Sequence, residues 1–219
     1  LEIEVLSAEG WAQISKIGRI EIPGAYVMRT DSQGVRLNET IAGTGYTGQG
    51  YRLSIYCQRP GRVEIPPIPV DVVVRRWGLN AEEVHLERET PTTVFTCEAP
   101  PGTETIRGLI STTRLDARQQ WSSSPETVAP GDAVTRSITR SAVDVPGMAF
   151  PPIEPPEIDG VAVYPGQATV SDEAGRGVLN GRREDGVTYV FERPGRVVLP
   201  DIELVWWDID DGVLRRIEL

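Results

Sequence analysis

Few residues of this chain of 219 residues have the types and spacing that catalysis requires. His85 is its only histidine and lies in the charged segment AEEVHLERE (81–89). No serine occupies a G-x-S-x-G turn, and neither cysteine has a basic neighbour in sequence that would activate its thiol. One histidine and two distant cysteines also lack the ligand spacing of a zinc site. We therefore expect His85 to be a solvated surface residue and the chain to be no enzyme.

A glycine-rich run raises the question of a nucleotide site. Glycines at positions 43, 45, 48 and 50 of GTGYTGQG satisfy the pattern G-x-G-x-x-G. In dinucleotide-binding folds this motif follows a strand and opens a helix whose N-terminus holds the pyrophosphate. Here the following residues, YRLSIYC (51–57), alternate as a strand does. The run predicts a hairpin or a bulged loop, and no cofactor is expected.

Two groups of acidic residues have side chains that could bind a metal ion or act as acid and base. DIDDG (208–212) resembles the start of a calcium loop, but the remaining EF-hand ligands are absent, and Asp-Asp-Gly is also an ordinary turn between strands. Glu154, Glu157 and Asp159 lie in a Pro-rich stretch, which provides no rigid spacing for acid–base work. We expect a hairpin turn in the first case and solvated carboxylates in the second, with no catalytic residue and no metal ligand.

The elements that would position such residues are organised by an internal repeat. The segments 51–70, YRLSIYCQRPGRVEIPPIPV, and 185–204, DGVTYVFERPGRVVLPDIEL, share RPGRV and then match again at Pro66 with Pro200 and at Ile68 with Ile202. Before each Pro-Gly the apolar residues alternate as in a half-buried strand. Pro-Gly suits a type II turn, so we expect a β-hairpin at Pro60-Gly61 and at Pro194-Gly195. The apolar phase slips by one residue beside each later proline, which predicts a bulge where the strand bends or changes sheets.

The two cysteines are candidates for a disulfide. Cys57 has the inward phase of its strand, at the position of Phe191 in the second repeat, and Cys97 shares a face with Phe95. Both are therefore expected in the core of the first domain. In an oxidising compartment such a pair would be bonded, whereas in cytosol the two would remain buried thiols.

Short segments rich in β-branched residues and bounded by Pro or Gly predict an all-β fold. They are 92–99, 106–112, 133–143 and 161–166, and the only helical turn expected is LNAEEVHLE (79–87). We predict two tandem immunoglobulin-like β-sandwich domains, 1–100 and 101–219, joined near PPGTET. PPIEPPEIDG (151–160) is expected to be an extended, stiff loop of the second domain.

Charge and hydropathy restrict the partners. The formal net charge is -10 and the isoelectric point is near 4.7, which would repel nucleic acid and anionic lipid. No run approaches a membrane span, no signal peptide is recognised, and the first residue is Leu1. We expect a soluble piece of a larger exported protein that binds other proteins and whose membrane anchor lies outside these residues.

One tryptophan pair is a candidate contact site. Neighbours on a strand point to opposite faces, and the phase of Ile202 and Leu204 assigns Trp206 to the core. Trp207 then shares the outer face with Val205, which makes these two a candidate interaction surface. The alternative is that the Pro-rich loop covers this face within the domain.

The second half of the chain resembles the BatD family, the oxygen-tolerance or aerotolerance proteins encoded beside MoxR-type ATPases and von Willebrand factor A domain proteins. The resemblance covers most of residues 115–219 and less closely the first half. It rests on the strings PGDAVTRSITRSAVDVPGMAFPPI (130–153), VAVYPGQATVSDEAGRGVLNGRRED (161–185) and YVFERPGRVVLPDIELVWWD (189–208). It implies a periplasmic β-rich region of a bacterial inner-membrane protein, with a transmembrane helix beyond residue 219 and von Willebrand A-type partners from the same operon. The alternative from another class is a carbohydrate- or cell-envelope-binding sandwich, which could use some of the five tryptophans.

Overall fold

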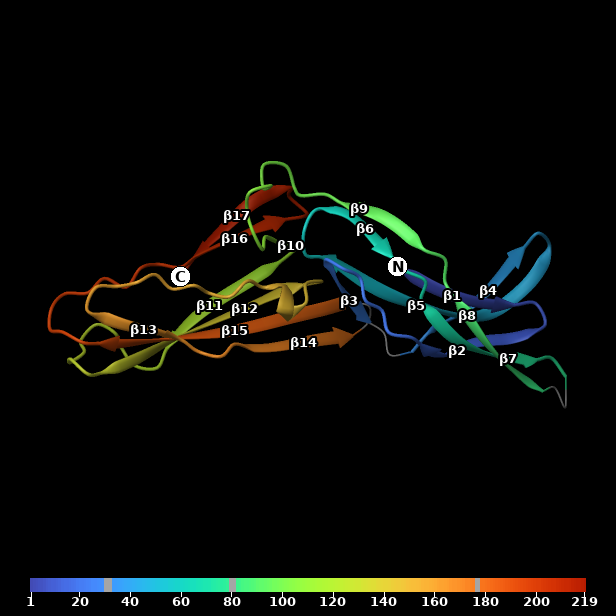
Figure 1. Cartoon of the computed structure of the whole chain (residues 1–219), viewed down its shortest axis with the longest axis horizontal. Helices are drawn as coiled ribbons and strands as arrows, with labels where there is room; N and C mark the ends of the chain where they lie inside the picture. Colours follow the sequence, from blue (N-terminus) through green and yellow to red (C-terminus); the bar gives the residue numbers. More distant parts are fainter. Residues whose placement is uncertain (30–32, 79–81, 176–177) are drawn as a thin grey trace. The chain divides into compact units, whose positions relative to one another are not determined.

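The computed structural model describes residues 1–29, 33–78, 82–175 and 178–219 (Figure 1). These residues form an all-β structure of several sheets, and the only helical element among them is a 3₁₀ turn, η1 (Gly147–Ala149). No helix in the described residues has the length and apolar character to cross a bilayer. The chain divides into two compact units, Leu1–Ala99 and Pro100–Ala174 with Val178–Leu219. This division falls one residue before the expected boundary.

The first unit contains a seven-stranded sheet and a separate two-stranded sheet. In the large sheet β1, β5, β2, β7 and β8 follow one another, and β3 and β4 also pair with β5; the small sheet is β6 with β9. The strands are β1 (Glu2–Ser7), β2 (Gly10–Ile17), β3 (Ala25–Arg29), β4 (Val35–Ile41), β5 (Thr44–Cys57), β6 (Gly61–Ile65), β7 (Pro69–Arg76), β8 (Glu83–Glu89) and β9 (Thr93–Cys97).

The second unit contains a five-stranded and a three-stranded sheet. The larger one has the order β11, β12, β15, β13, with β14 also paired to β15, and the smaller one has the order β10, β16, β17. The strands are β10 (Ile110–Thr112), β11 (Leu115–Trp121), β12 (Ala133–Val143), β13 (Val161–Pro165), β14 (Thr169–Gly175), β15 (Val178–Phe191), β16 (Glu203–Asp208) and β17 (Val213–Glu218).

The two units repeat one arrangement of six strands. In the first unit the central strand is β5, of 14 residues, with β1 on one side and both β3 and β4 on the other. In the second unit it is β15, also of 14 residues, with β12 on one side and both β13 and β14 on the other. An antiparallel pair, β7 with β8 or β16 with β17, then follows in the chain. The internal repeat therefore includes far more of the chain than the segment around RPGRV.

An arginine side chain lies against a glycine at the start of β3 and, in the same way, at the start of β13. A Cβ atom added at Gly24 would lie 3.2 Å from Nε of Arg59, and one added at Gly160 would lie 3.3 Å from Nε of Arg193. Each glycine has a positive φ, +82° and +76°, which a side chain would disfavour. The carbonyl oxygen of each glycine accepts a backbone hydrogen bond of 2.9 Å from the residue that precedes the arginine. The first arginine of RPGRV thus covers the turn that opens the neighbouring strand.

The predicted hairpins at the two Pro-Gly turns are wrong. β5 and β6 belong to different sheets, and after β15 no strand forms until β16, which lies in the three-stranded sheet. Gly61 and Gly195 have φ values of +129° and +151°, positive but beyond the value of about +80° that a type II turn requires. The last residues of β15 pair with β12 on one edge and with β13 on the other, so the chain that follows must leave for another sheet. In the first unit the last residues of β5 pair with β3, and β6 pairs with β9 instead.

The predicted change of sheet near Pro66 is confirmed. β6 lies in the small sheet and β7, which begins at Pro69, lies in the large one. The alternating apolar residues are buried both before and after the one-residue shift: Val63 and Ile65 precede it, and Ile68 and Val70 follow it. Near Pro200 the residues before β16 form no strand, so there the slip is a change of phase in an irregular segment.

The predicted helical turn at 79–87 is also wrong where the structure describes it. Residues 83–89 form β8, in which half-buried Val84 and Leu86 alternate with exposed neighbours, while 79–81 lie outside the described residues. Pairing with β7 favours this extended form over a single helical turn. The other predicted strands are found, although 106–112 contributes only Ile110–Thr112. The Pro-rich stretch has no strand over 151–157.

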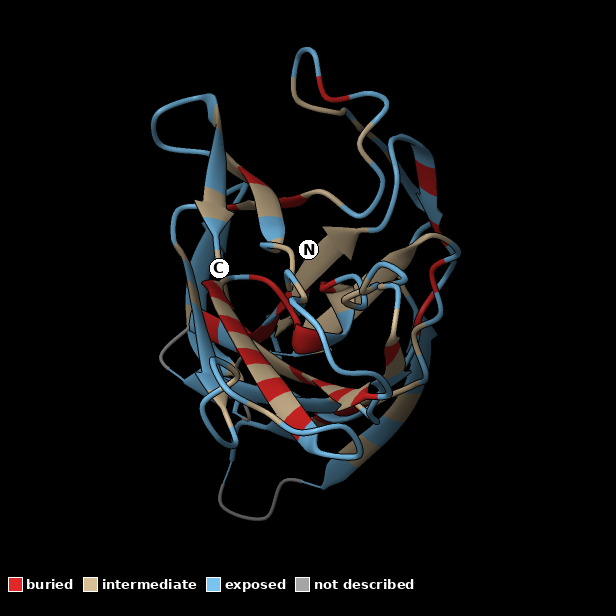
Figure 2. Ribbon diagram, turned by 90° about the vertical axis from the view of Figure 1, so that its left-hand side faces the viewer, coloured by how far each residue is buried: buried red, intermediate tan, exposed pale blue. Residues whose placement is uncertain are grey.

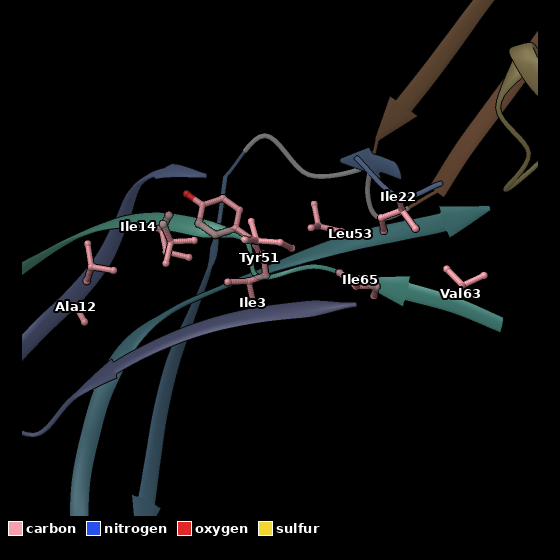
Figure 3. Close-up of a cluster of buried hydrophobic side chains, with 11 residues drawn as sticks. Ile3, Ala12, Ile14, Ile22, Tyr51, Leu53, Val63 and Ile65 are labelled. Atoms are coloured by element: carbon pink, nitrogen blue, oxygen red, sulfur yellow. The ribbon is translucent and has the colours of Figure 1, made fainter. Parts of the chain in front are cut away.

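The core of the first unit is built from both of its sheets. Ile3 of β1, Tyr51 of β5 and Ile65 of β6 belong to one cluster of buried side chains (Figure 3). The core of the second unit includes Val187, Tyr189 and Phe191, which confirms the inward phase predicted for this strand. Figure 2 shows such alternation as red and tan bands along single strands.

Candidate protein-binding groove

The first unit carries an open groove with a volume of about 810 Å³. One wall is the whole of β1, and the floor consists of inward side chains of the core. The opposite wall is formed by β8 and by the segment that leads into β9. The apolar residues that line the groove are Ile3, Val5, Ala12, Ile65, Ile68, Val70, Val72, Val74 and Leu86.

The floor of the groove is apolar because the small sheet covers only part of the large one. β6 and β9 have five residues each, and they lie over the core at Val63 and Ile65. Beyond them Val5, Val74 and Leu86 remain half-buried at the edge of the core. Clefts that bind protein segments commonly combine such an apolar floor with polar walls.

The rim of the groove is acidic. Glu2 and Glu4 of β1 are exposed, and Glu89 lines the opposite wall beside Arg88. Glu2 is paired with Arg52 at 2.7 Å, which offsets part of its charge. The chain as a whole carries a formal net charge of -10, which favours a basic partner.

The cysteines predicted as partners lie together and form a disulfide. Cys57 ends β5 in the large sheet, Cys97 ends β9 in the small sheet, and their Cα atoms are 6.5 Å apart. The bond therefore ties the two sheets of the first unit. The equivalent position in the second unit is filled by Phe191, which is buried in the core of that unit.

The predicted surface on β16 is only half exposed. Trp206 has 6% of its surface accessible, which confirms its assignment to the core, and its Nε1 is buried without an acceptor in the described residues. Val205 and Trp207 are intermediate in burial, and Trp207 is flanked by Ser111 of β10 and Leu214 of β17. The structure therefore brings the two predicted residues to one face, but it leaves much less of them exposed than an open contact patch would.

The structure reveals buried arginines that the sequence analysis missed. Arg136 is 2% exposed; it donates hydrogen bonds to Oε1 of Gln119 at 2.7 Å and to the backbone oxygens of Pro200 at 3.0 Å and Leu219 at 2.6 Å. Its guanidinium also stacks on Trp121 with 5.1 Å to the ring centroid. These bonds join the large sheet of the second unit to the open end of the β16–β17 hairpin, opposite its turn.

Arg140 lies four residues after Arg136, on the same face of β12, and forms a second buried group. Its Nη2 lies 2.5 Å from Oδ2 of Asp185, and the other carboxylate oxygen, Oδ1, accepts from Nη2 of Arg183 at 2.8 Å. Burial lowers the pKa of Arg140, and the charge of Asp185 opposes this effect. The signal was available in TRSITR (135–140), because Arg136 and Arg140 share the period-2 phase of buried Val134 and Ile138.

The remaining candidates lie on surfaces and turns. His85 is exposed on β8, and the glycine run begins in the two-residue turn between β4 and β5, where Ala42 and Gly43 have φ of 51° and 81°. Residues 44–57 then form a strand and not the helix that a dinucleotide site needs. Glu154, Glu157 and Asp159 are dispersed along the Pro-rich loop, where Asp159 pairs with Arg193 at 2.6 Å.

The segment DIDDG is a hairpin turn, as predicted. It connects β16 to β17, with Gly212 at φ +63° and its N–H donating to the carbonyl oxygen of Asp208 at 2.9 Å. The carboxylate of Asp208 accepts from Nε of Arg215 at 2.5 Å and from the backbone N–H of Asp210 and Asp211. These bonds, that from Arg215 first, lower the pKa of Asp208. Across the described ranges no three His, Cys, Asp or Glu side chains are grouped to hold a metal ion.

The groove of the first unit is thus the feature whose geometry suits binding, and the polar groups of the second unit are tied into its core and turns. Comparisons with protein-family models, with curated proteins and with solved structures found no match.

Proposed function

We propose that this chain is a non-catalytic protein-interaction module of a membrane-anchored, BatD-like protein on the periplasmic side of a bacterial inner membrane. In this proposal it assembles with von Willebrand A-type proteins of the same operon in stress or oxygen tolerance. The observation that carries the proposal is the groove of the first unit, where the core is left half-covered as an apolar floor beside an acidic rim. Clefts that combine an apolar floor with a few polar groups are common binding sites.

The architecture supports an assembly role. We propose that both units are immunoglobulin-like β-sandwiches, because each has a long central strand with partners on both sides and contains two sheets. Tandem sandwiches of this type present strand edges and loops for binding. Two of the buried polar side chains are bonded within the unit: Arg136 to Pro200 and Leu219, and Nη2 of Arg140 to Asp185, while Nε of Arg140 has no partner in the described residues.

The disulfide supports the proposed compartment. A bond between Cys57 and Cys97 forms and persists in an oxidising environment such as the bacterial periplasm. A first unit with a partly uncovered core would also gain stability from such a bond.

Sugar binding is the weaker alternative. Stacking on a carbohydrate needs an exposed aromatic platform, and Trp77 is 65% exposed at the end of β7. Trp206 is buried, and Trp121 is covered by Arg136 and lies 6.0 Å from Tyr189. Among the described tryptophans, Trp77 alone is strongly exposed, so no adjoining pair forms such a platform.

Crosslinking in native membranes tests the proposal. The membrane-anchored protein is crosslinked, purified and digested, and we expect crosslinked peptides that join the first unit to a von Willebrand A-type protein. Leu86→Glu, which places a carboxylate in the groove, should abolish these crosslinks. The matched control is His85→Glu, which adds the same group to the outer face of the same strand and should leave them unchanged. Recovery of only the uncrosslinked protein, or equal crosslinking by both variants, would contradict the proposal.

A further inference from the structure

We propose that the free edge of β1 accepts an extended segment of the partner protein as an added antiparallel strand. The apolar side chains of this segment would fill the groove, and its outward side chains would be basic. The inference rests on the proposed function and specifies the kind of segment that the groove binds.

The second unit contains a strand that the first unit lacks. β12, the counterpart of β1, pairs with β15 on one side and with β11 on the other, from Leu115 opposite Ala142 to Trp121 opposite Arg136. β1 pairs with β5, and the described part of the chain provides no second ladder for it. In the position that β11 occupies beside β12, the first unit has the groove.

The hydrogen bonds establish that β1 and β12 lie on the same side of the central strands. Leu53 of β5 exchanges backbone bonds with Leu1, at 3.0 and 2.8 Å. Phe191 of β15 bonds in the same way to the start of β12, at 2.7 and 3.1 Å to Gly131 and Asp132. Leu53 and Phe191 both point their side chains into the core. In a strand, the chain direction and the direction of a side chain together determine the edge to which the N–H and C=O of that residue point. The edge of β5 that β1 occupies is therefore equivalent to the edge of β15 that β12 occupies.

The free edge of β1 presents a regular set of backbone groups. Since Leu1 bonds to β5, the odd-numbered residues of β1 face β5, and Glu2, Glu4 and Leu6 turn their N–H and C=O to the groove side. The corresponding edge of β12 is used by β11, where the N–H of Ser122 donates to the carbonyl oxygen of Thr135 at 2.8 Å. An added strand would satisfy the edge groups of β1 as β11 satisfies those of β12.

The side chains beside this edge define the chemistry of the segment. Its inward residues would lie next to Ile3 and Val5 and would contact Leu86 across the groove. Its outward residues would lie next to Glu2 and Glu4, where opposite charges stabilise cross-strand pairs. β1 has six residues, so the expected segment is about six residues long and alternates apolar with Lys or Arg.

The same charges argue against a second copy of this chain as the occupant. If β1 paired with β1 of another copy, the exposed glutamates of the two strands would lie side by side. Like charges in directly opposite positions destabilise a strand pair. Exposed charge is a common protection of strand edges against self-association, and here it leaves the edge selective for a basic strand.

A defined peptide tests the inference. The probe is a seven-residue peptide that alternates lysine and valine, and the matched control alternates glutamate and valine. We expect the lysine peptide alone to bind the full chain, and to slow amide hydrogen exchange at Glu4 and Leu6 while exchange at Val5, already bonded to β5, changes little. Glu4→Lys should weaken this binding by about tenfold, as a favourable cross-strand pair becomes a repulsive one. The control Glu39→Lys, on exposed β4, makes the same change in net charge away from the groove and should have no effect.

The possible failures are distinguishable. Binding of the peptide without protection of Glu4 and Leu6 would overturn strand addition, and equal binding of the acidic peptide would overturn the predicted charge. In both cases loss of partner crosslinks in Leu86→Glu would still support the groove as a protein site. If Leu86→Glu kept the crosslinks of the wild type, the proposed function itself would fail.

Discussion

The guanidinium of Arg136 donates a hydrogen bond to the backbone oxygen of Leu219, with 2.6 Å between Nη2 and the oxygen. Arg136 lies on β12 of the large sheet, Leu219 directly follows β17 of the small sheet, and the bond is partly buried. A charged side chain therefore closes the contact between these sheets where an apolar residue would be expected.

Replacing Arg136 with leucine should destabilise the second unit. The change would remove the donor from Oε1 of exposed Gln119 and from the half-buried oxygen of Pro200, whereas the oxygen of Leu219 would keep its bond from the N–H of Ile202. An unpaired buried acceptor costs about 1–3 kcal/mol, so the expected loss in the free energy of unfolding lies in that range. Urea unfolding followed by tryptophan fluorescence measures it, with Arg118→Leu on exposed β11 as the control. A loss equal to that of the control would contradict the structural role.

Asp208 should contribute to stability in a pH-dependent way. Its pKa lies below the ordinary 3.8, because Arg215 and two backbone N–H groups stabilise the carboxylate. Since the unfolded state takes up the proton first, the contribution is fully present above 3.8 and is lost as the pH falls through the lower folded pKa. Asp208→Asn should therefore flatten the acid side of the stability curve. Thermal unfolding across a pH series checks this, and an unchanged acid slope would rule it out.

The adjacent tryptophans of β16 should differ in their effect on stability. Trp206→Ala removes a side chain that is 6% exposed and should cost about 3–5 kcal/mol through cavity formation. Trp207→Ala removes a half-buried side chain and should cost about 1 kcal/mol. Chemical unfolding of both variants is the measurement. Equal, large losses would show that Trp207 is a packing residue and no contact residue.

The disulfide should be present and stabilising in protein made in an oxidising compartment. It spans 40 positions, and closing such a loop contributes about 4 kcal/mol in the chain-entropy model. Replacing both Cys57 and Cys97 with alanine should lower the free energy of unfolding of the first unit accordingly. Intact mass after alkylation of unfolded, unreduced protein gives an independent check, because two alkylated thiols would disprove the bond.

Much of the fold could be predicted from the sequence because strand alternation is a local signal. The inward phase of Val187, Tyr189 and Phe191 followed from period 2, and so did the assignment of Trp206 to the core. The same pattern put Cys57 and Cys97 on inward faces, where the structure joins them. The turn at 208–212 followed from its own residues, because Asp and Gly form such turns in any context.

Alternation was obscured where charged residues take part in it. TRSITR alternates as a strand with Arg136 and Arg140 on the inward face, and EVHLE alternates in the same way, but the inward arginines and the second strand were not predicted. Whether a buried arginine is tolerated depends on acceptors such as Gln119 and Leu219, which come from distant parts of the chain.

By itself, the sequence determined the all-β class, the repeat and the faces of its strands, since each depends on residues a few positions apart. Only the tertiary structure decided which strands are neighbours. Pro60-Gly61 could close a hairpin or connect two sheets, and the outcome depended on β6 pairing with β9, a strand later in the chain. The free edge of β1 was likewise decided by the tertiary structure. A strand edge is free or paired according to what lies beside it, and the residue pattern of Glu2–Ser7 does not predict which.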